Sequence, residues 1–117
     1  MKKKIIMGSI IVALTSNSFA SVTTAKISKI LVVDSTKRVY VYPVGGISMP
    51  AACATSASAT SYYSFSTDRP LSREYLSMLL SAQASGKTVS LYGKDSCVDQ
   101  SGIETLNYLT INSPQEN

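Results

Sequence analysis

The residues that could carry chemistry in this sequence are few, and the most versatile one is missing. The chain contains no histidine, which removes the commonest general base and the commonest metal ligand. Among the seven carboxylates, Asp95 and Asp99 flank Cys97 and could offer oxygen atoms to calcium together with Gln100. The stretch lacks the repeated oxygen ligands and the central glycine of a dedicated calcium loop. We therefore interpret both aspartates as solvated turn residues and predict neither a metal site nor a cofactor.

The nucleophiles of the chain also lack partners. Ser48, Ser56 and Ser58 have no histidine to activate them and no glycines of the nucleophile-elbow type. Lys87 would act as a base only if it were buried, and it directly follows a predicted helix end. The sequence therefore predicts that the protein is not an enzyme. An enzyme would instead need a concave site with Lys87 or paired carboxylates of strongly shifted pKa.

The seven tyrosines are the one compositional feature that indicates binding. A tyrosine ring combines a flat apolar face with a hydroxyl group, which suits both sugars and protein partners. The candidate binding surface consists of four of them, Tyr40, Tyr42, Tyr62 and Tyr92. The alternative is that these are ordinary strand residues with hydrated hydroxyl groups, because tyrosine favours pleated surfaces.

The two cysteines, Cys53 and Cys97, predict a single disulfide bond. Closing a loop of this length contributes about 4 kcal/mol to stability in the chain-entropy model. A reactive thiol and a metal site are the alternatives, but the chain has no histidine and no Cys-x-x-Cys pair, in which two residues separate the cysteines. The disulfide would tie the middle of the chain to the segment before the last strand.

Residues 1–20 have the pattern of a cleaved signal peptide. Three consecutive lysines are followed by an apolar run over residues 5–14, and Ser18 and Ala20 place small residues three and one before the cleavage position. A membrane anchor is the alternative, but the run is about half as long as a membrane span requires. Ser21 at the new N-terminus, in place of a cysteine, argues against a lipoprotein. We predict a secreted or periplasmic protein without a membrane span after cleavage.

Removing this leader also changes the charge of the chain. Lys2, Lys3 and Lys4 are three of the eleven basic residues, so eight basic residues remain against seven acidic ones. A net charge of +1 without any cluster of basic and aromatic residues argues against nucleic-acid binding. The remaining 97 residues are expected to form one domain, residues 21–117, whose small core benefits from a disulfide.

The middle of the chain predicts a helix that leads into a strand. Thr67 and Asp68 are typical of a helix start. Pro70 suits the first turn, and Gly86 suits the end. Residues 89–92 then alternate between apolar and polar, as in a strand. Apolar residues at helical spacing predict one buried helix face, formed by Leu71, Tyr75, Leu76, Met78, Leu79, Leu80 and Ala82.

Further strands are predicted from alternation and from residues that favour pleated structure. A change of phase between Leu106 and Leu109 indicates either a bulge in the last strand or a strand that is covered on both faces. The element order is then β-β-β-α-β-β, which predicts a mainly β protein with one helix on an open or closed antiparallel sheet. The predicted segments are a hairpin over residues 26–44, strands over 60–66 and 103–111, a frayed polar start over 21–25 and a loop over 45–59.

Residues 76–92, LSMLLSAQASGKTVSLY, carry a resemblance to a known family. With a first cysteine in a serine-rich loop, an aromatic-rich strand, a second cysteine and a closing apolar strand, they resemble small exported proteins of Gram-negative bacteria. Those proteins look like the B subunits of subtilase cytotoxin and typhoid toxin. The similarity covers residues 53–111 and implies a small antiparallel OB-like barrel or curved sheet. It also implies a homo-oligomeric, five-membered ring that binds glycans.

The chain departs from that family in two respects. It has no counterpart of the toxin subunits' sugar-contacting serine loop or of their second disulfide, so no binding residue is carried over. We predict a secreted or periplasmic binding module without catalytic activity, for which glycan binding is what the resemblance implies. The alternative is a monomeric periplasmic protein that has a structural role or inhibits a partner enzyme through the loop around Cys53.

Overall fold

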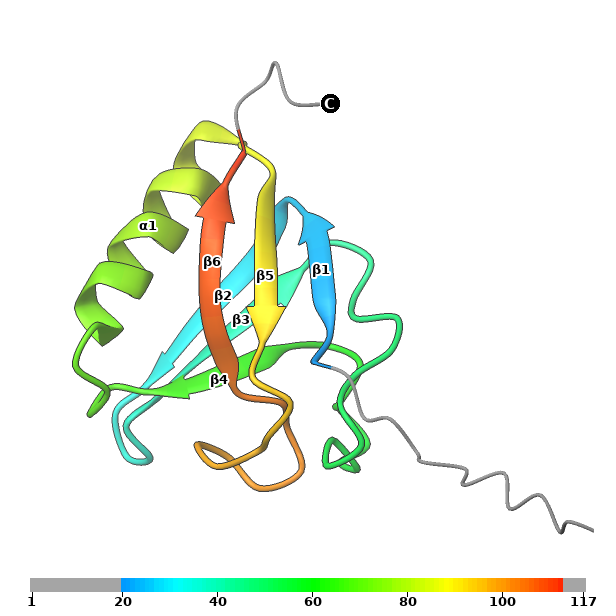
Figure 1. Cartoon of the computed structure of the whole chain (residues 1–117). Coiled ribbons are helices and arrows are strands. Elements are labelled where there is room, and N and C mark those ends of the chain that lie inside the picture. The colour runs from blue at the N-terminus through cyan, green and yellow to red at the C-terminus, as the bar shows by residue number, and fades with distance from the viewer. Residues whose placement is uncertain (1–19, 113–117) are drawn as a thin grey trace, which may run out of the picture.

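The computed structural model describes residues 20–112, and the predicted signal peptide lies outside the described residues except for Ala20. Within this range the fold has six strands and one helix (Figure 1). The elements are β1 (Val22–Ala25), β2 (Ile27–Val33), β3 (Arg38–Pro43), β4 (Tyr63–Ser66), α1 (Ser72–Ser85), β5 (Val89–Gly93) and β6 (Leu106–Ile111). The described part of the chain is therefore mainly β with one helix, as predicted.

The strands form two antiparallel, three-stranded sheets, ordered β1-β5-β6 and β2-β3-β4. Figure 1 shows the first sheet in front of β2 and β3. On one side the sheets are linked by the chain itself, since only Lys26 separates β1 from β2. On the other side a single parallel bridge joins Ser64 of β4 to Thr105, just before β6. The side chains between the sheets form the hydrophobic core.

Strand β1 corrects the prediction of a frayed start over residues 21–25. These residues pair with β5, from Val22 opposite Tyr92 to Ala25 opposite Val89. The strand lies at the edge of its sheet and its residues are exposed or half-buried, so it shows no apolar alternation. Its pairing depends on a segment far along the chain, which local patterns do not reveal.

The predicted alternation is confirmed in β3, where Val39 and Val41 are buried and Tyr40 and Tyr42 point to the outer face. The bulge in the last strand is also present. Tyr92 pairs with Tyr108 but Gly93 pairs with Leu106, which leaves one extra residue in β6. This extra residue allows both Leu106 and Leu109 to be buried.

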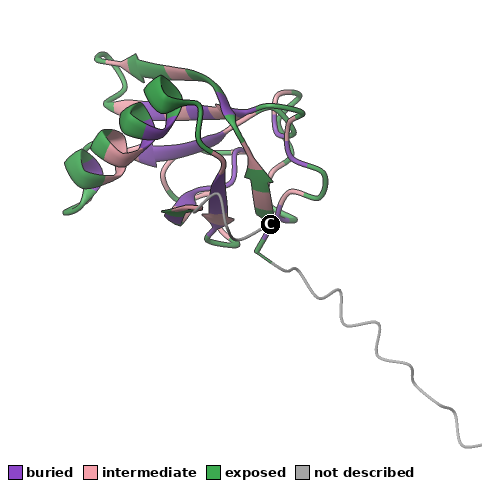
Figure 2. Cartoon of the chain, turned by 90° about the horizontal axis from the view of Figure 1, so that it is seen from above, coloured by how far each residue is buried: buried purple, intermediate pink, exposed green. Residues whose placement is uncertain are grey.

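The helix α1 packs against β2 and β6, one edge strand from each sheet. Leu79 and Ala82 are fully buried, and Tyr75, Leu76 and Met78 pack against the same core. Figure 2 shows buried residues on the strands and on the helix side that faces them, with exposed residues on the outer side of the helix.

The helix ends as predicted but begins later. Gly86 adopts the left-handed conformation, with φ of 66°, that closes the helix. The predicted start at Thr67 and Asp68 is wrong, because residues 67–71 form turns and the first helical residue is Ser72. Leu71 therefore lies outside the helical period and is 53% exposed, although it was expected on the buried face. Leu80 is exposed as well.

Candidate functional site

Three of the predicted binding residues form one aromatic cluster on the outer face of the β2-β3-β4 sheet. Tyr40 and Tyr42 project from β3, and Tyr62 directly precedes β4. The Tyr62 ring centroid lies 4.8 Å from that of Tyr40 and 4.8 Å from that of Tyr42. All three side chains are partly exposed. We call these three residues the tyrosine cluster.

Polar groups border the tyrosine cluster. Lys29, which pairs with Tyr42 across β2 and β3, places its Nζ 4.3 Å from the centroid of that ring. The Tyr40 hydroxyl donates to Gln100 Oε1 at 3.0 Å. Burial raises the pKa of the Tyr62 hydroxyl, and the neighbouring Tyr42 and Tyr40 raise it further. The Tyr62 hydroxyl is therefore neutral at physiological pH and can both donate and accept hydrogen bonds.

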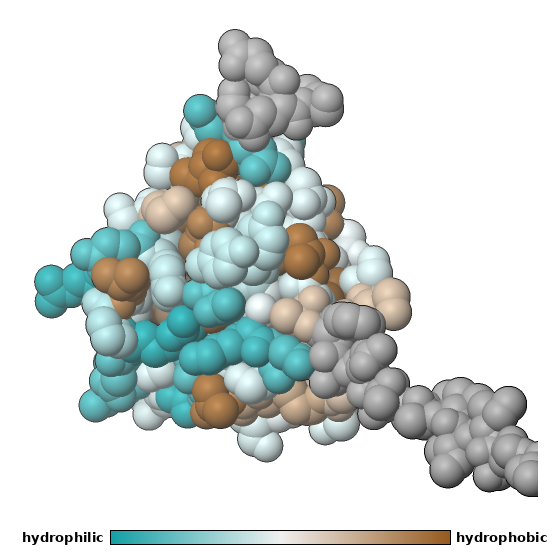
Figure 3. Space-filling model, viewed as in Figure 1, coloured by the Kyte–Doolittle hydropathy of each residue, from teal (hydrophilic) through white to brown (hydrophobic). Residues whose placement is uncertain are grey.

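The fourth predicted residue, Tyr92, lies on the other sheet. Its ring stacks on Tyr108 of β6, with 4.3 Å between centroids and 9° between planes. Val22 follows on the other side of Tyr92 in the same cross-strand row. The structure thus brings together three of the four predicted tyrosines and separates the fourth. Figure 3 shows the β1-β5-β6 sheet as a mostly pale and teal surface with separate hydrophobic spots.

The disulfide between Cys53 and Cys97 is confirmed, with 6.0 Å between the Cα atoms. It joins the loop between β3 and β4 to the loop between β5 and β6. In Figure 1 the loop between β5 and β6 lies at the lower end of the molecule, and the loop between β3 and β4 runs down the side opposite the helix to the same end. Asp99, considered above as a calcium ligand, accepts a hydrogen bond from the Ser66 amide at 2.8 Å and lies 3.6 Å from Arg69. It supports the fold, and residues 20–112 contain no group of three acidic or cysteine side chains placed to hold a metal.

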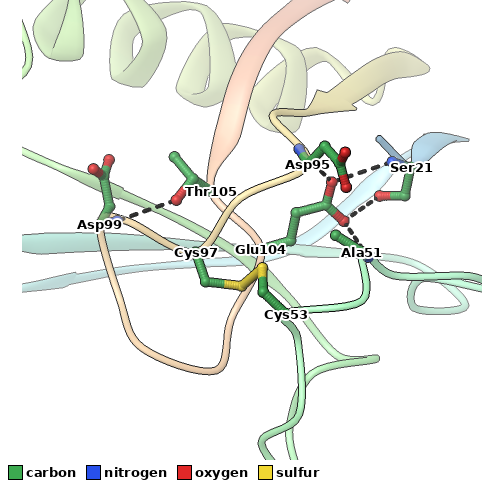
Figure 4. The surroundings of a disulfide bond; sticks show 8 residues. All are labelled: Ser21, Ala51, Cys53, Asp95, Cys97, Asp99, Glu104 and Thr105. Carbon is green, nitrogen blue, oxygen red and sulfur yellow. Dashed lines mark hydrogen bonds between the residues drawn. A yellow bond between two sulfur atoms is a disulfide. The ribbon is translucent and has the colours of Figure 1, made fainter. Parts of the chain in front are cut away.

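A second polar centre next to the disulfide was not predicted from the sequence. Glu104, which falls within the strand predicted over residues 103–111, is 0% exposed. Its Oε1 accepts hydrogen bonds from Ser21 Oγ at 2.7 Å and from the Ala51 amide at 2.9 Å. Its Oε2 accepts from the Ser21 amide at 3.1 Å and from the Asp95 amide at 3.3 Å. The carboxylate thus holds together three segments that are distant in sequence (Figure 4).

A row of hydroxyl groups also points toward this carboxylate. Because Ser21 Oγ donates its only proton to Glu104, the Tyr63 hydroxyl at 2.7 Å must donate to Ser21 Oγ. Thr23 Oγ1, 2.8 Å from Tyr63, then donates to that hydroxyl in turn. Burial raises the pKa of Tyr63 and the nearby Glu104 charge raises it further, while the bonds to Ser21 and Thr23 act in the opposite direction. The chain of donors orders β1 against the core.

We call Glu104, Ser21, Ala51 and Asp95 the Glu104 centre. One signal for it was present in the sequence: Glu104 stands two positions before Leu106, so an extended chain places both on the same face. Its partners could not be predicted, because they come from the chain before β1 and from two loops.

Replacing Gly93 with alanine is expected to destabilise the fold by about 2 kcal/mol. An added Cβ at this position would lie 1.9 Å from Glu104 Oε2, and the carboxylate cannot retreat without losing its hydrogen bonds. Urea unfolding of Gly93→Ala measures the effect. Gly45→Ala is a useful comparison, because its Cβ would meet nothing within 4 Å and only its positive φ opposes the change. Equal stability of Gly93→Ala and the unmodified protein would contradict the tight packing of Glu104.

No helix within residues 20–112 has the length and apolarity needed to cross a membrane. No protein-family model, curated protein or solved structure matches this chain.

Proposed function

We propose that this protein is an exported binding module without catalytic activity, which binds carbohydrate through the tyrosine cluster. The observation that carries the proposal is the contact of Tyr62 with both Tyr40 and Tyr42 on an outer sheet face. Tyrosine rings offer flat surfaces to the C–H faces of a sugar, and their hydroxyl groups can bond its hydroxyls. Lys29 and Gln100 add a donor and an acceptor at the edge of the same surface.

The strand order supports an OB-like reading of the fold. Counting β1 and β2 as one bent strand makes β3 and β4 the second and third strands, with α1 between the third and fourth. In OB-folds the face of strands 2 and 3 is a common binding surface for oligosaccharides and oligonucleotides. On this OB-like reading, the tyrosine cluster on β3 and β4 corresponds to that face. The near-neutral charge expected for residues 21–117 favours a sugar over a nucleic acid.

Export and assembly complete the proposal. The disulfide is typical of proteins that fold outside the cytoplasm, and the pattern of residues 1–20 is that of a signal peptide. The resemblance to toxin B subunits implies a ring of identical subunits. In such a ring several weak sites act together, so that modest affinity at each tyrosine cluster is sufficient for tight attachment to a glycosylated surface. Sedimentation of the purified protein measures this assembly, and a strictly monomeric protein would argue against the ring.

Substituting Tyr62 with alanine is expected to weaken glycan binding at least about tenfold, which corresponds to about 1.4 kcal/mol. Tyr62 contacts both other members of the cluster, so its loss removes one ring and loosens two. A glycan array identifies the bound sugar, and calorimetric titration with that sugar gives the dissociation constants. Tyr108→Ala is the matched control, because Tyr108 is 46% exposed but lies on the other sheet. Equal losses for the two variants, or an array without any retained glycan, would contradict the proposal.

Inhibition of a partner enzyme is the second candidate, and one observation favours it. Met49 is 80% exposed on the loop between β3 and β4, while Ile47 and Ala51 on either side are buried. The loop is fixed by the disulfide and by the bond from the Ile47 amide to the Thr60 carbonyl at 2.8 Å. A fixed loop with a projecting side chain suits insertion into a partner's pocket. Recovery of an enzyme from a periplasmic extract by the unmodified protein, but not by Met49→Asp, would favour this function.

A further inference from the structure

The nitrogen of Ser21 occupies an unusual position. It donates to Glu104 Oε2 at 3.1 Å, and Ser21 itself is only 7% exposed. The Ser21 carbonyl accepts from the Gly93 amide at 2.8 Å, so the residue is held on both sides. The preceding residue, Ala20, is exposed. The predicted cleavage position therefore lies at the point where the chain enters the core.

Within residues 20–112, the buried carboxylate of Glu104 has no cationic partner. All four of its hydrogen bonds come from neutral donors. Arg69 forms its ion pair with Asp99 and does not reach Glu104. A carboxylate without solvent or a counter-charge is costly to bury, and buried charges in proteins are normally paired. The Glu104 centre therefore lacks one component, a positive charge.

We infer that hydrolysis of the Ala20–Ser21 bond supplies this charge, and that the α-ammonium group of Ser21 pairs with Glu104 in the mature protein. The inference rests on the export that forms part of the proposed function. A signal peptidase adds water across the bond: the carboxylate remains on Ala20 and the released amine of Ser21 takes up a proton. The ammonium nitrogen occupies the place of the present amide, 3.1 Å from Oε2. One side of it then faces Glu104, and the other faces the solvent where Ala20 was.

This arrangement makes processing part of folding. The uncleaved chain offers Glu104 an amide proton, whereas the mature chain offers a full positive charge at the same distance. A shift of the cleavage position by even one residue would have an effect, because the next residue, Val22, already belongs to β1 and pairs with Tyr92. A chain cut one residue later would lose both the amine at this site and the Ser21 hydroxyl that donates to Oε1.

Chemical acetylation of the mature N-terminus tests the ion pair. The chain beginning at Ser21 and its Nα-acetylated form differ by one charge, and acetylation restores the neutral amide seen here. We expect acetylation to raise the equilibrium constant for unfolding at least about tenfold. In the Glu104→Gln variant, which lacks the partner charge, acetylation should change the logarithm of this unfolding constant by less than half as much. Equal effects of acetylation in both backgrounds would overturn the pairing.

A second measurement needs no variant. An acylating reagent near neutral pH normally modifies an α-amine faster than lysine side chains, because the α-amine has the lower pKa. Pairing with Glu104 should slow this reaction at Ser21 at least about tenfold relative to the urea-unfolded protein. An equal rate in both states would overturn the inference. The mass of the exported protein shows separately whether it begins at Ser21, and another N-terminus would overturn the processing step. Neither result depends on glycan binding.

Discussion

Replacing Glu104 with glutamine lowers the free energy of unfolding by about 3 kcal/mol. Each carboxylate oxygen accepts two hydrogen bonds, so the amide group of glutamine must replace an oxygen that faces donors. At the Oε2 position it would confront two backbone N–H groups. At the Oε1 position it would confront the Ala51 amide. Buried donors then lose their acceptor, and the site is 0% exposed, so water does not replace it.

Urea unfolding of the mature chain measures this effect. Glu74→Gln is the matched control, since Glu74 lies exposed in the first turn of α1 and its replacement should change stability by less than about 0.5 kcal/mol. If Glu104→Gln were as stable as Glu74→Gln, the hydrogen bonds of Glu104 would contribute little to the stability of the fold.

Removing the disulfide in the double variant Cys53→Ser/Cys97→Ser lowers the free energy of unfolding by about 4 kcal/mol. The bond spans a sequence separation of 44 residues and therefore restricts a large part of the unfolded chain. The effect also reaches the Glu104 centre. Ala51 and Asp95, whose amides bind Glu104, each stand two residues before one of the cysteines.

Because of this proximity, the disulfide and Glu104 should not act independently. Combining the double cysteine variant with Glu104→Gln is expected to cost less than the sum of the two effects, by about 1 kcal/mol. Urea midpoints of the four proteins provide this comparison, with a reducing agent added to the cysteine-free protein as a control for unspecific effects. A loss below about 1 kcal/mol on removing the disulfide would contradict its stabilising role.

The sequence predicted the local features of this fold well, because local periodicity determines them. Val39 and Val41 alternate with two tyrosines, and the structure places the valines inside and the tyrosines outside. The end of the helix at Gly86 likewise depends on a conformation that glycine adopts easily. The start of the helix was misplaced because Thr67 and Asp68 are equally suited to the turns that they form.

The features that the sequence did not predict depend on contacts between distant segments. Strand β1 has no recognisable pattern of its own and forms because β5 offers it an edge. Tyr92 was grouped with the tyrosine cluster by residue type, although sheet membership separates it from the other three. The burial of Glu104 requires Ser21, Ala51 and Asp95 to meet, and no spacing within the sequence relates them.

The most direct test of the proposed function is an NMR titration of the mature, isotope-labelled protein with the sugar selected by a glycan array. We predict that the backbone amide signals of Tyr40, Tyr42 and Tyr62 shift with a common dissociation constant, together with that of Lys29 opposite Tyr42. Shifts confined to the β1-β5-β6 sheet, or no shifts at saturating sugar, would contradict the assignment of the tyrosine cluster as the binding surface.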